Sequence, residues 1–100
     1  MTDHIPEKRA FKRHRVLAGA EIQNLWRGTR CAVRDVSVFG ANLVISPAIR
    51  LQEFLHIHIA VWNLSVNAEV VWRQANRVGV KFADPPDRLK AIIQKIERAR

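Results

Sequence analysis

Hydrophobic and polar residues alternate along most of the chain between residues 14 and 82. An alternation with a period of two is typical of β-strands that place one face in a core. The clearest case is the segment 54–62, in which every second residue from Leu55 to Val61 is aliphatic and His56 and His58 stand between them. The pattern predicts six strands, at residues 16–25, 29–36, 41–45, 54–62, 65–74 and 78–82.

Most of the predicted strands are separated by short gaps, such as Ala75 and Asn76. Short connections favour antiparallel pairing of neighbouring strands. Six strands in so short a stretch also favour closure into a small barrel, because closure leaves no exposed sheet edge. We therefore expect a six-stranded antiparallel β-barrel.

The end of the chain has a helical pattern instead. Asp84 precedes Pro85 and Pro86, and this order predicts a helix start in which the Asp84 side chain caps free amide groups. Apolar residues then recur at helical spacing, namely Leu89, Ile92, Ile93 and Ile96. The predicted fold class is mainly β, a barrel with one C-terminal α-helix that lays its apolar stripe on the barrel.

The first 13 residues show no clear period, and they are polar and basic. We interpret residues 1–13 as a flexible basic arm and residues 14–100 as a single barrel domain with its helix. The chain has 17 Lys and Arg against 9 Asp and Glu, for a net charge of +8. Such an excess attracts anions, whether nucleic acid, nucleotide or acidic lipid, and does not distinguish among them.

The basic arm contains an R-x-x-x-R pair, Arg9 and Arg13. Each guanidinium offers a planar fork of donors that matches phosphate oxygens or the O6 and N7 edge of guanine. Arginines four residues apart are common in basic chains, so a solvated tail explains the pair equally well when it is considered alone.

A second motif, D-x-S-x-x-G, lies in the stretch RDVSVFGANL between two predicted strands. It consists of Asp35, Ser37 and Gly40. A turn explains all three, because Asp and Ser can bond local amides and Gly40 can adopt a positive φ. Alternatively, Asp35 and Ser37 present hydrogen-bonding groups from a strand end, and the carboxylate can accept the N1 and N2 donors of a guanine.

The two motifs together, followed by a small barrel and a terminal helix, resemble the PilZ domain family. EKRAFKRHRV resembles the E-R-R-x-F-x-R stretch of that family, and VVWRQANRVGVKF resembles its closing hairpin. PilZ domains are bacterial receptors for the second messenger cyclic di-GMP. The resemblance implies that Arg9 and Arg13 grip phosphates and guanine edges.

It also implies that Asp35 and Ser37 contact a guanine and that Gly40 lets the ligand approach the backbone. Lys8 stands where the family more often has Arg. An ammonium supplies charge but no bidentate fork. The sequence therefore leaves open whether one or two ligand molecules bind per protomer.

Two further residues, Trp72 and Arg73, are possible ligand contacts. Trp72 continues the alternation of the core positions Val66, Ala68 and Val70, which favours a place in the core. The alternative is that its indole stacks on a guanine. Arg73 is expected to be at most a peripheral phosphate contact.

Other candidate residues give weaker indications of a function. Cys31 is the only cysteine, which excludes an internal disulfide, and we expect it to be a buried strand thiol. His56 and His58 offer only two ligands where zinc usually has three or four, so we expect surface histidines and no metal or cofactor. The chain begins with charges and contains no apolar run long enough for a membrane span, so we expect a cytoplasmic protein.

The sequence contains no recognisable catalytic constellation, and we expect no enzymatic activity. The leading hypothesis is a cyclic di-GMP receptor that orders its basic arm on binding and signals through contact with an effector protein, as a monomer or homodimer. One alternative is a PilZ-like interaction module that binds no nucleotide. The other is a small basic barrel that binds nucleic acid, although its strands show no run of aromatics interleaved with Lys and Arg.

Overall fold

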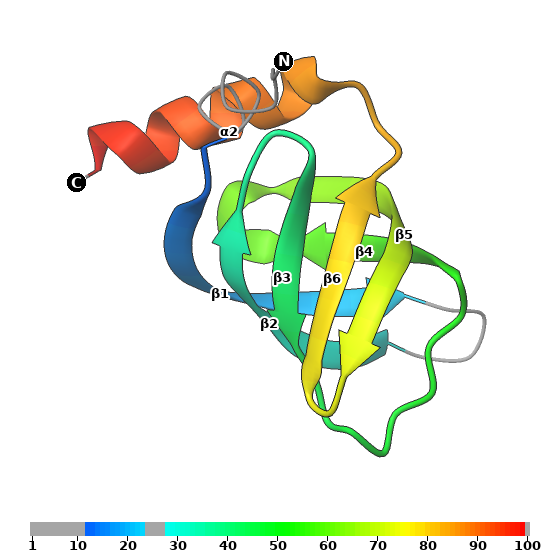
Figure 1. The fold of residues 1–100 in the computed structure, drawn as a ribbon. Helices are drawn as coiled ribbons and strands as arrows, with labels where there is room; N and C mark the ends of the chain where they lie inside the picture. The colour runs from blue at the N-terminus through cyan, green and yellow to red at the C-terminus, as the bar shows by residue number, and fades with distance from the viewer. Residues whose placement is uncertain (1–11, 24–27, 100) are drawn as a thin grey trace, which may run out of the picture.

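The computed structural model describes residues 12–23 and 28–99 (Figure 1). The predicted Lys8 and Arg9 contacts, and most of the basic arm, lie outside the described residues. The elements are, in chain order, β1 (His14–Gln23), β2 (Gly28–Val36), β3 (Gly40–Val44), β4 (Phe54–Ile59), the short 3-10 helix η1 (Ala60–Trp62), β5 (Leu64–Gln74), β6 (Arg77–Phe82) and α2 (Pro86–Arg98).

The six strands form a closed antiparallel barrel in the order β1-β2-β3-β6-β5-β4. β1–β2, β2–β3, β4–β5 and β5–β6 are neighbours in the chain, whereas β3 pairs with β6 and β1 pairs with β4 to complete the ring. The predicted fold class is therefore confirmed. Every edge has a partner in the ring, which is how a barrel avoids edge-to-edge association.

Aliphatic residues at alternating strand positions fill the barrel interior, as the alternation predicted, with the exceptions of Val61 and Trp72. Val33, Leu43 and Val78 are at most 1% exposed, and they belong to three adjacent strands. Removing such side chains from water supplies the main driving force for folding, at about 1.5 to 3 kcal/mol for each fully buried aliphatic side chain. The helix α2 lies across one end of the barrel (Figure 1) and buries the predicted stripe Leu89, Ile92, Ile93 and Ile96.

Polar contacts at both ends of α2 connect it to the barrel. In the last turn, Glu97 Oε2 lies 2.8 Å from Nε2 of the buried His14, the first residue of β1. At the other end, Asp84 does not cap the helix as we predicted, because the N-cap position is Pro85 and has no side-chain cap. Asp84 instead accepts hydrogen bonds from the backbone N–H of Asn67 in β5 and from the Arg88 guanidinium.

The fourth strand is shorter than the segment 54–62 that the alternation predicted. It ends at Ile59, and the chain reverses through η1 and Asn63, which adopts a left-handed φ of 48°. Val61 therefore leaves the interior and is 71% exposed. Alternation in the sequence continued past the point where the backbone must turn toward β5. Among the described helices, none has the length and apolar character that a membrane crossing requires.

Candidate functional site

The two sequence motifs meet at Asp35. Arg13 Nη1 lies 2.6 Å from Asp35 Oδ1 although the two residues are 22 positions apart. The Asn42 side chain of β3 donates a hydrogen bond of 2.8 Å to the other carboxylate oxygen, Oδ2. A register shift between Val33 and Asp35 interrupts the β2–β3 ladder at this position. Such a bulge redirects side chains, and here the carboxylate lies half-buried on the outside of the barrel.

The Arg13–Asp35 ion pair is more exposed on its cationic side. The Arg13 side chain is 54% exposed and the Asp35 side chain 20%. Ion pairs with exposed partners stabilise proteins by at most about 1 kcal/mol, so little free energy opposes their exchange for another partner. Asp35 is held in place by Asn42, whereas Arg13 is accessible to an anion.

Ser37 organises the turn between β2 and β3. Its side chain is buried, and its Oγ accepts hydrogen bonds from the backbone N–H groups of Phe39 at 3.2 Å and Gly40 at 3.3 Å. The Ser37 N–H donates to the Gly40 carbonyl at 2.8 Å. The turn-forming role that the motif allowed is therefore present, and a contact between Ser37 and a ligand stays a prediction.

Gly40 has a structural role that the sequence did not indicate, and its predicted role in letting a ligand approach the backbone stays a prediction. No described glycine has a positive φ, so the expectation of a left-handed Gly40 was wrong. A Cβ at this position would instead collide with the backbone carbonyl oxygen of Val80 in β6. Gly40 thus allows β3 and β6 to approach each other, directly beside the Ser37 turn.

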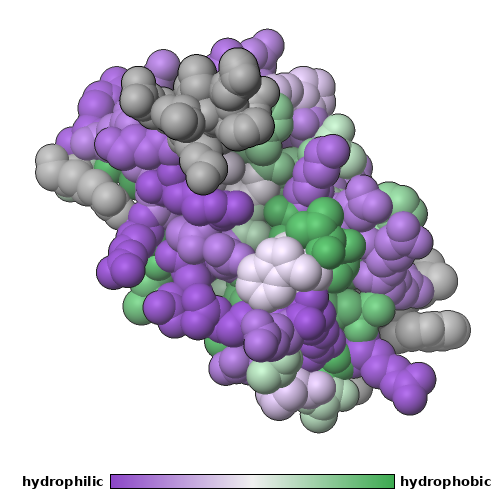
Figure 2. All heavy atoms as spheres, viewed as in Figure 1, coloured by the Kyte–Doolittle hydropathy of each residue, from purple (hydrophilic) through white to green (hydrophobic). Residues whose placement is uncertain are grey.

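A row of cross-strand neighbours continues from Asp35 around the outside of the barrel. In register order these residues, which we call the outer row, are Arg15 of β1, Asp35 of β2, Asn42 of β3, Gly79 of β6 and Trp72 of β5. In the view of Figure 2, hydrophilic side chains dominate over β2 and β3, and hydrophobic side chains gather beside them over β5 and β6.

Trp72 lies at the end of the outer row and not in the core. It is 44% exposed, and its indole covers Gly79, where an added Cβ would collide with the ring. The core position favoured by the alternation is therefore wrong. A register shift between Val70 and Trp72 in the β5–β6 ladder explains the error, because a bulge changes the face on which the following residues lie.

Arg73 uses its guanidinium within the protein. Nη1 donates to the Ile49 carbonyl at 2.5 Å, Nη2 to the Ser46 carbonyl at 3.0 Å and Nε to the Ala75 carbonyl at 3.4 Å. The bonds to Ile49 and Ser46 attach the β3–β4 connection to β5. The Arg73 guanidinium therefore holds that connection in place. The predicted phosphate contact would require the guanidinium to give up these hydrogen bonds.

Asn42 is a site residue that the sequence interpretation missed. Its Nδ2 orients Asp35, while its Oδ1 is buried without a hydrogen-bond partner among the described residues. The signal was available, because Asn42 alternates with the buried Ala41 and Leu43. In the β2–β3 hairpin this pattern puts the Asn42 side chain outside the barrel, opposite Asp35.

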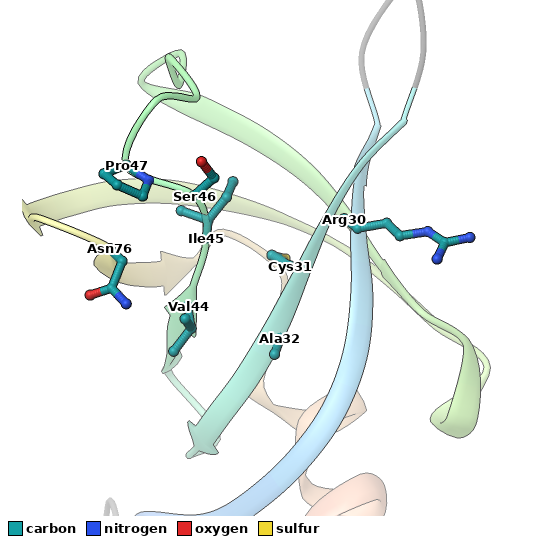
Figure 3. A pocket seen from close by; sticks show the side chains of 8 residues that line it. All are labelled: Arg30, Cys31, Ala32, Val44, Ile45, Ser46, Pro47 and Asn76. Atoms are coloured by element: carbon teal, nitrogen blue, oxygen red, sulfur yellow. The ribbon is translucent and has the colours of Figure 1, made fainter.

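Cys31 lines a shallow pocket of about 370 Å³ beside Val44 and Ile45, from which Arg30 points away (Figure 3). Burial raises the pKa of the Cys31 thiol to about 11. The thiolate is the nucleophilic form, so Cys31 is a poor nucleophile at neutral pH.

The histidines of β4 bond side chains of β5. His56 Nδ1 lies 2.9 Å from Asn67 Oδ1 and His58 Nδ1 lies 2.8 Å from Ser65 Oγ. Within residues 12–23 and 28–99, no three His, Cys, Asp or Glu side chains gather as metal ligands would.

Comparisons with known proteins identify the family and support the fold. The model of the PilZ domain family matches residues 7–98. A crystal structure of an uncharacterized Legionella protein is similar, with a TM-score of 0.66 and 15% sequence identity over 90% of this chain and 98% of that one. At that identity the likeness shows the fold alone. No curated protein matches the chain. Because the family model spans nearly the whole chain, including both motifs, the chain belongs to the PilZ domain family.

Proposed function

We propose that this protein is a cytoplasmic cyclic di-GMP receptor without enzymatic activity. The observation that carries the proposal is the contact between Arg13 and Asp35, which joins the two motifs in one place. Membership of the PilZ domain family supports it. The proposed contacts are made by Arg9, Arg13, Asp35, Ser37 and Gly40, with additional charge from Lys8.

The chemistry of the two side chains suits a guanine nucleotide. The Asp35 carboxylate can accept hydrogen bonds from the N1 and N2 donors of a guanine while Asn42 keeps the carboxylate in place. Arg13 would exchange its surface ion pair for a phosphate or for the O6 and N7 edge of the base. The bound ligand thus takes over an interaction that contributes little to stability.

Trp72 would supply an aromatic surface at the other end of the outer row. Its exposed indole, on the same outer face as Asp35, is available for stacking with a guanine. Such stacking contributes about 1 to 3 kcal/mol per base in single-strand recognition. Trp72 is therefore part of the proposed site, although the alternation in the sequence favoured a place for it in the core.

Signal output would follow from ordering of the basic arm. In the proposed mechanism, ligand binding fixes residues 1–13 against the barrel, and the surface so formed contacts an effector protein. Ordering a segment costs conformational entropy, which the charge-assisted contacts to the ligand must offset.

Calorimetric titration with cyclic di-GMP tests the proposal. We expect saturable binding by the wild type, and a weakening of at least about tenfold for Arg13→Ala and for Asp35→Ala. Arg88→Ala is the matched control. Arg88, on α2, is another exposed arginine that forms an ion pair with an aspartate, and its Nη1 lies 2.7 Å from Asp84 Oδ2. We expect wild-type affinity for this control.

Absence of heat with the wild type at high micromolar ligand would contradict the receptor and support the interaction module. Equal and steeply salt-dependent binding of a short oligonucleotide would instead indicate a nucleic-acid-binding barrel.

A further inference from the structure

A second group of arginines lines a pocket on the outside of the barrel, beside Asp35. The pocket has a volume of about 390 Å³ and combines residues of β1, β2 and β6. Its lining consists of Arg15, Val16, Leu17, Arg34, Asp35 and Arg77. Asp35 therefore belongs both to the candidate site and to this pocket.

The positions of Arg34 and Arg77 follow from the strand pattern. Arg34 follows the buried Val33 and precedes Asp35 at the β2 bulge, and Arg77 precedes the buried Val78 at the start of β6. Both arginines are exposed outside the barrel. The intervening strand, β3, ends at Val44, which pairs with Arg77, and Arg34 and Arg77 line the same pocket.

The pocket carries an excess of positive charge. Three arginines line it together with one carboxylate, and both oxygens of that carboxylate already accept hydrogen bonds from Arg13 and Asn42. Among the described residues, neither Arg34 nor Arg77 forms an ion pair. Like charges gathered in a concave site raise the local concentration of anions, so the pocket suits an anionic group.

The lining also restricts the kind of anion. Arginine forks match the oxygens of phosphate groups. The Asp35 carboxylate repels additional negative charge and accepts N–H donors, so a polyacidic peptide fits poorly. A ligand that offers a phosphate on one side and N–H donors on the other, such as a guanine nucleotide, satisfies both parts of the pocket.

We infer that Arg34 and Arg77, with Arg15, form a phosphate subsite that binds a phosphodiester group of the ligand whose guanine contacts Asp35. The identity of this ligand as a cyclic dinucleotide rests on the proposed function. The subsite adds two cations, Arg34 and Arg77, that neither sequence motif contains. It supplies the bidentate arginine contacts that Lys8 cannot make.

Calorimetry on Arg34→Ala, Arg77→Ala and the double variant tests the subsite. We expect each single variant to bind cyclic di-GMP about tenfold more weakly and to lower the slope of log affinity against log salt by about one. Arg30→Ala is the matched control, because Arg30 is an exposed arginine of β2 outside this pocket. Circular dichroism confirms that each variant is folded.

Different results would overturn the subsite proposal and the receptor proposal. If Asp35→Ala abolishes binding while the double variant binds with the affinity and salt slope of Arg30→Ala, the subsite is wrong and the receptor stands. If the wild type binds no cyclic di-GMP, the proposed function is wrong, and inorganic pyrophosphate then tests the pocket alone. In the pyrophosphate titration, saturable shifts of the Arg34 and Arg77 Nε–H resonances would support the subsite, and unchanged resonances would overturn it.

Discussion

Two neighbouring rows of residues cross the same three strands with opposite chemistry. The inner row, Val33, Leu43 and Val78, pairs across β2, β3 and β6 and is almost fully buried. The outer row crosses these strands one pairing further along, through Asp35, Asn42 and Gly79. The inner row is defined by hydrophobicity alone, whereas the outer row depends on local departures from regular strand geometry.

The departures are two bulges and two glycines. The bulges precede Asp35 and Trp72, and the glycines allow close approach of Val80 and of the Trp72 indole. Bulges redirect side chains and are common beside functional sites. In this barrel the regular positions make the core, and the irregular positions make the outer surface that we propose binds the ligand.

The largest expected effect compares two leucines. Leu43→Ala removes a side chain that is 1% exposed, and Leu17→Ala removes one that is 84% exposed. We expect the free energy of unfolding to fall by about 2 to 5 kcal/mol for Leu43→Ala, because a cavity remains in the core. For Leu17→Ala we expect a change within about 0.5 kcal/mol. Urea titration measures both, and similar losses would contradict the inner and outer assignment.

The two glycines give a smaller contrast. In Gly40→Ala the new methyl group meets backbone of β6, which cannot move without opening the sheet, so we expect a loss of about 1 to 3 kcal/mol. In Gly79→Ala it meets the Trp72 side chain, which can rotate away. We expect a loss below about 1 kcal/mol and a shifted Trp72 indole resonance. An equal loss in the two variants would show that the indole cannot move.

The sequence predicted the regular part of the molecule more fully than the irregular part. Six strands, the terminal helix stripe and the core followed from periodicity, and the motifs indicated that Arg13 and Asp35 share a site. Alternation could not reveal a bulge, because a bulge depends on pairing with another strand, and Trp72 was therefore placed on the wrong face. Asp84 failed as a cap for a similar reason, since the Asn67 amide that it bonds belongs to β5.

A variant of Arg73 tests whether its guanidinium stabilises the fold or contacts the ligand. Arg73→Ala removes the donors to Ser46 and Ile49, and we expect a loss of about 1 to 2 kcal/mol in stability. Amide hydrogen exchange should accelerate in residues 46–49, whereas Arg30→Ala should leave it unchanged. Weaker cyclic di-GMP binding without this acceleration would instead support the phosphate contact predicted from the sequence.

The smallest effect concerns Cys31, which extends the inner side of β2 beyond Val33. Burial raises the pKa of its thiol to about 11, so the unfolded chain loses this proton at lower pH than the folded protein. The thiol's contribution to stability is present at neutral pH and is lost as the pH rises toward about 11. Iodoacetamide should alkylate the native protein more slowly than the urea-unfolded chain, and equal rates at pH 8 would contradict this burial.

We propose that cyclic di-GMP binds over the outer row, where Asp35 and Trp72 lie, and not in the interior or on the far surfaces. Titration followed by nitrogen–proton correlation spectra of the wild type tests it most directly. We predict saturable shifts of the Asn42 side-chain amide, the Gly79 backbone amide and the Trp72 indole N–H, with smaller shifts along the inner row. An unchanged outer row at saturating ligand, or shifts confined to α2 and the β3–β4 connection, would contradict the account.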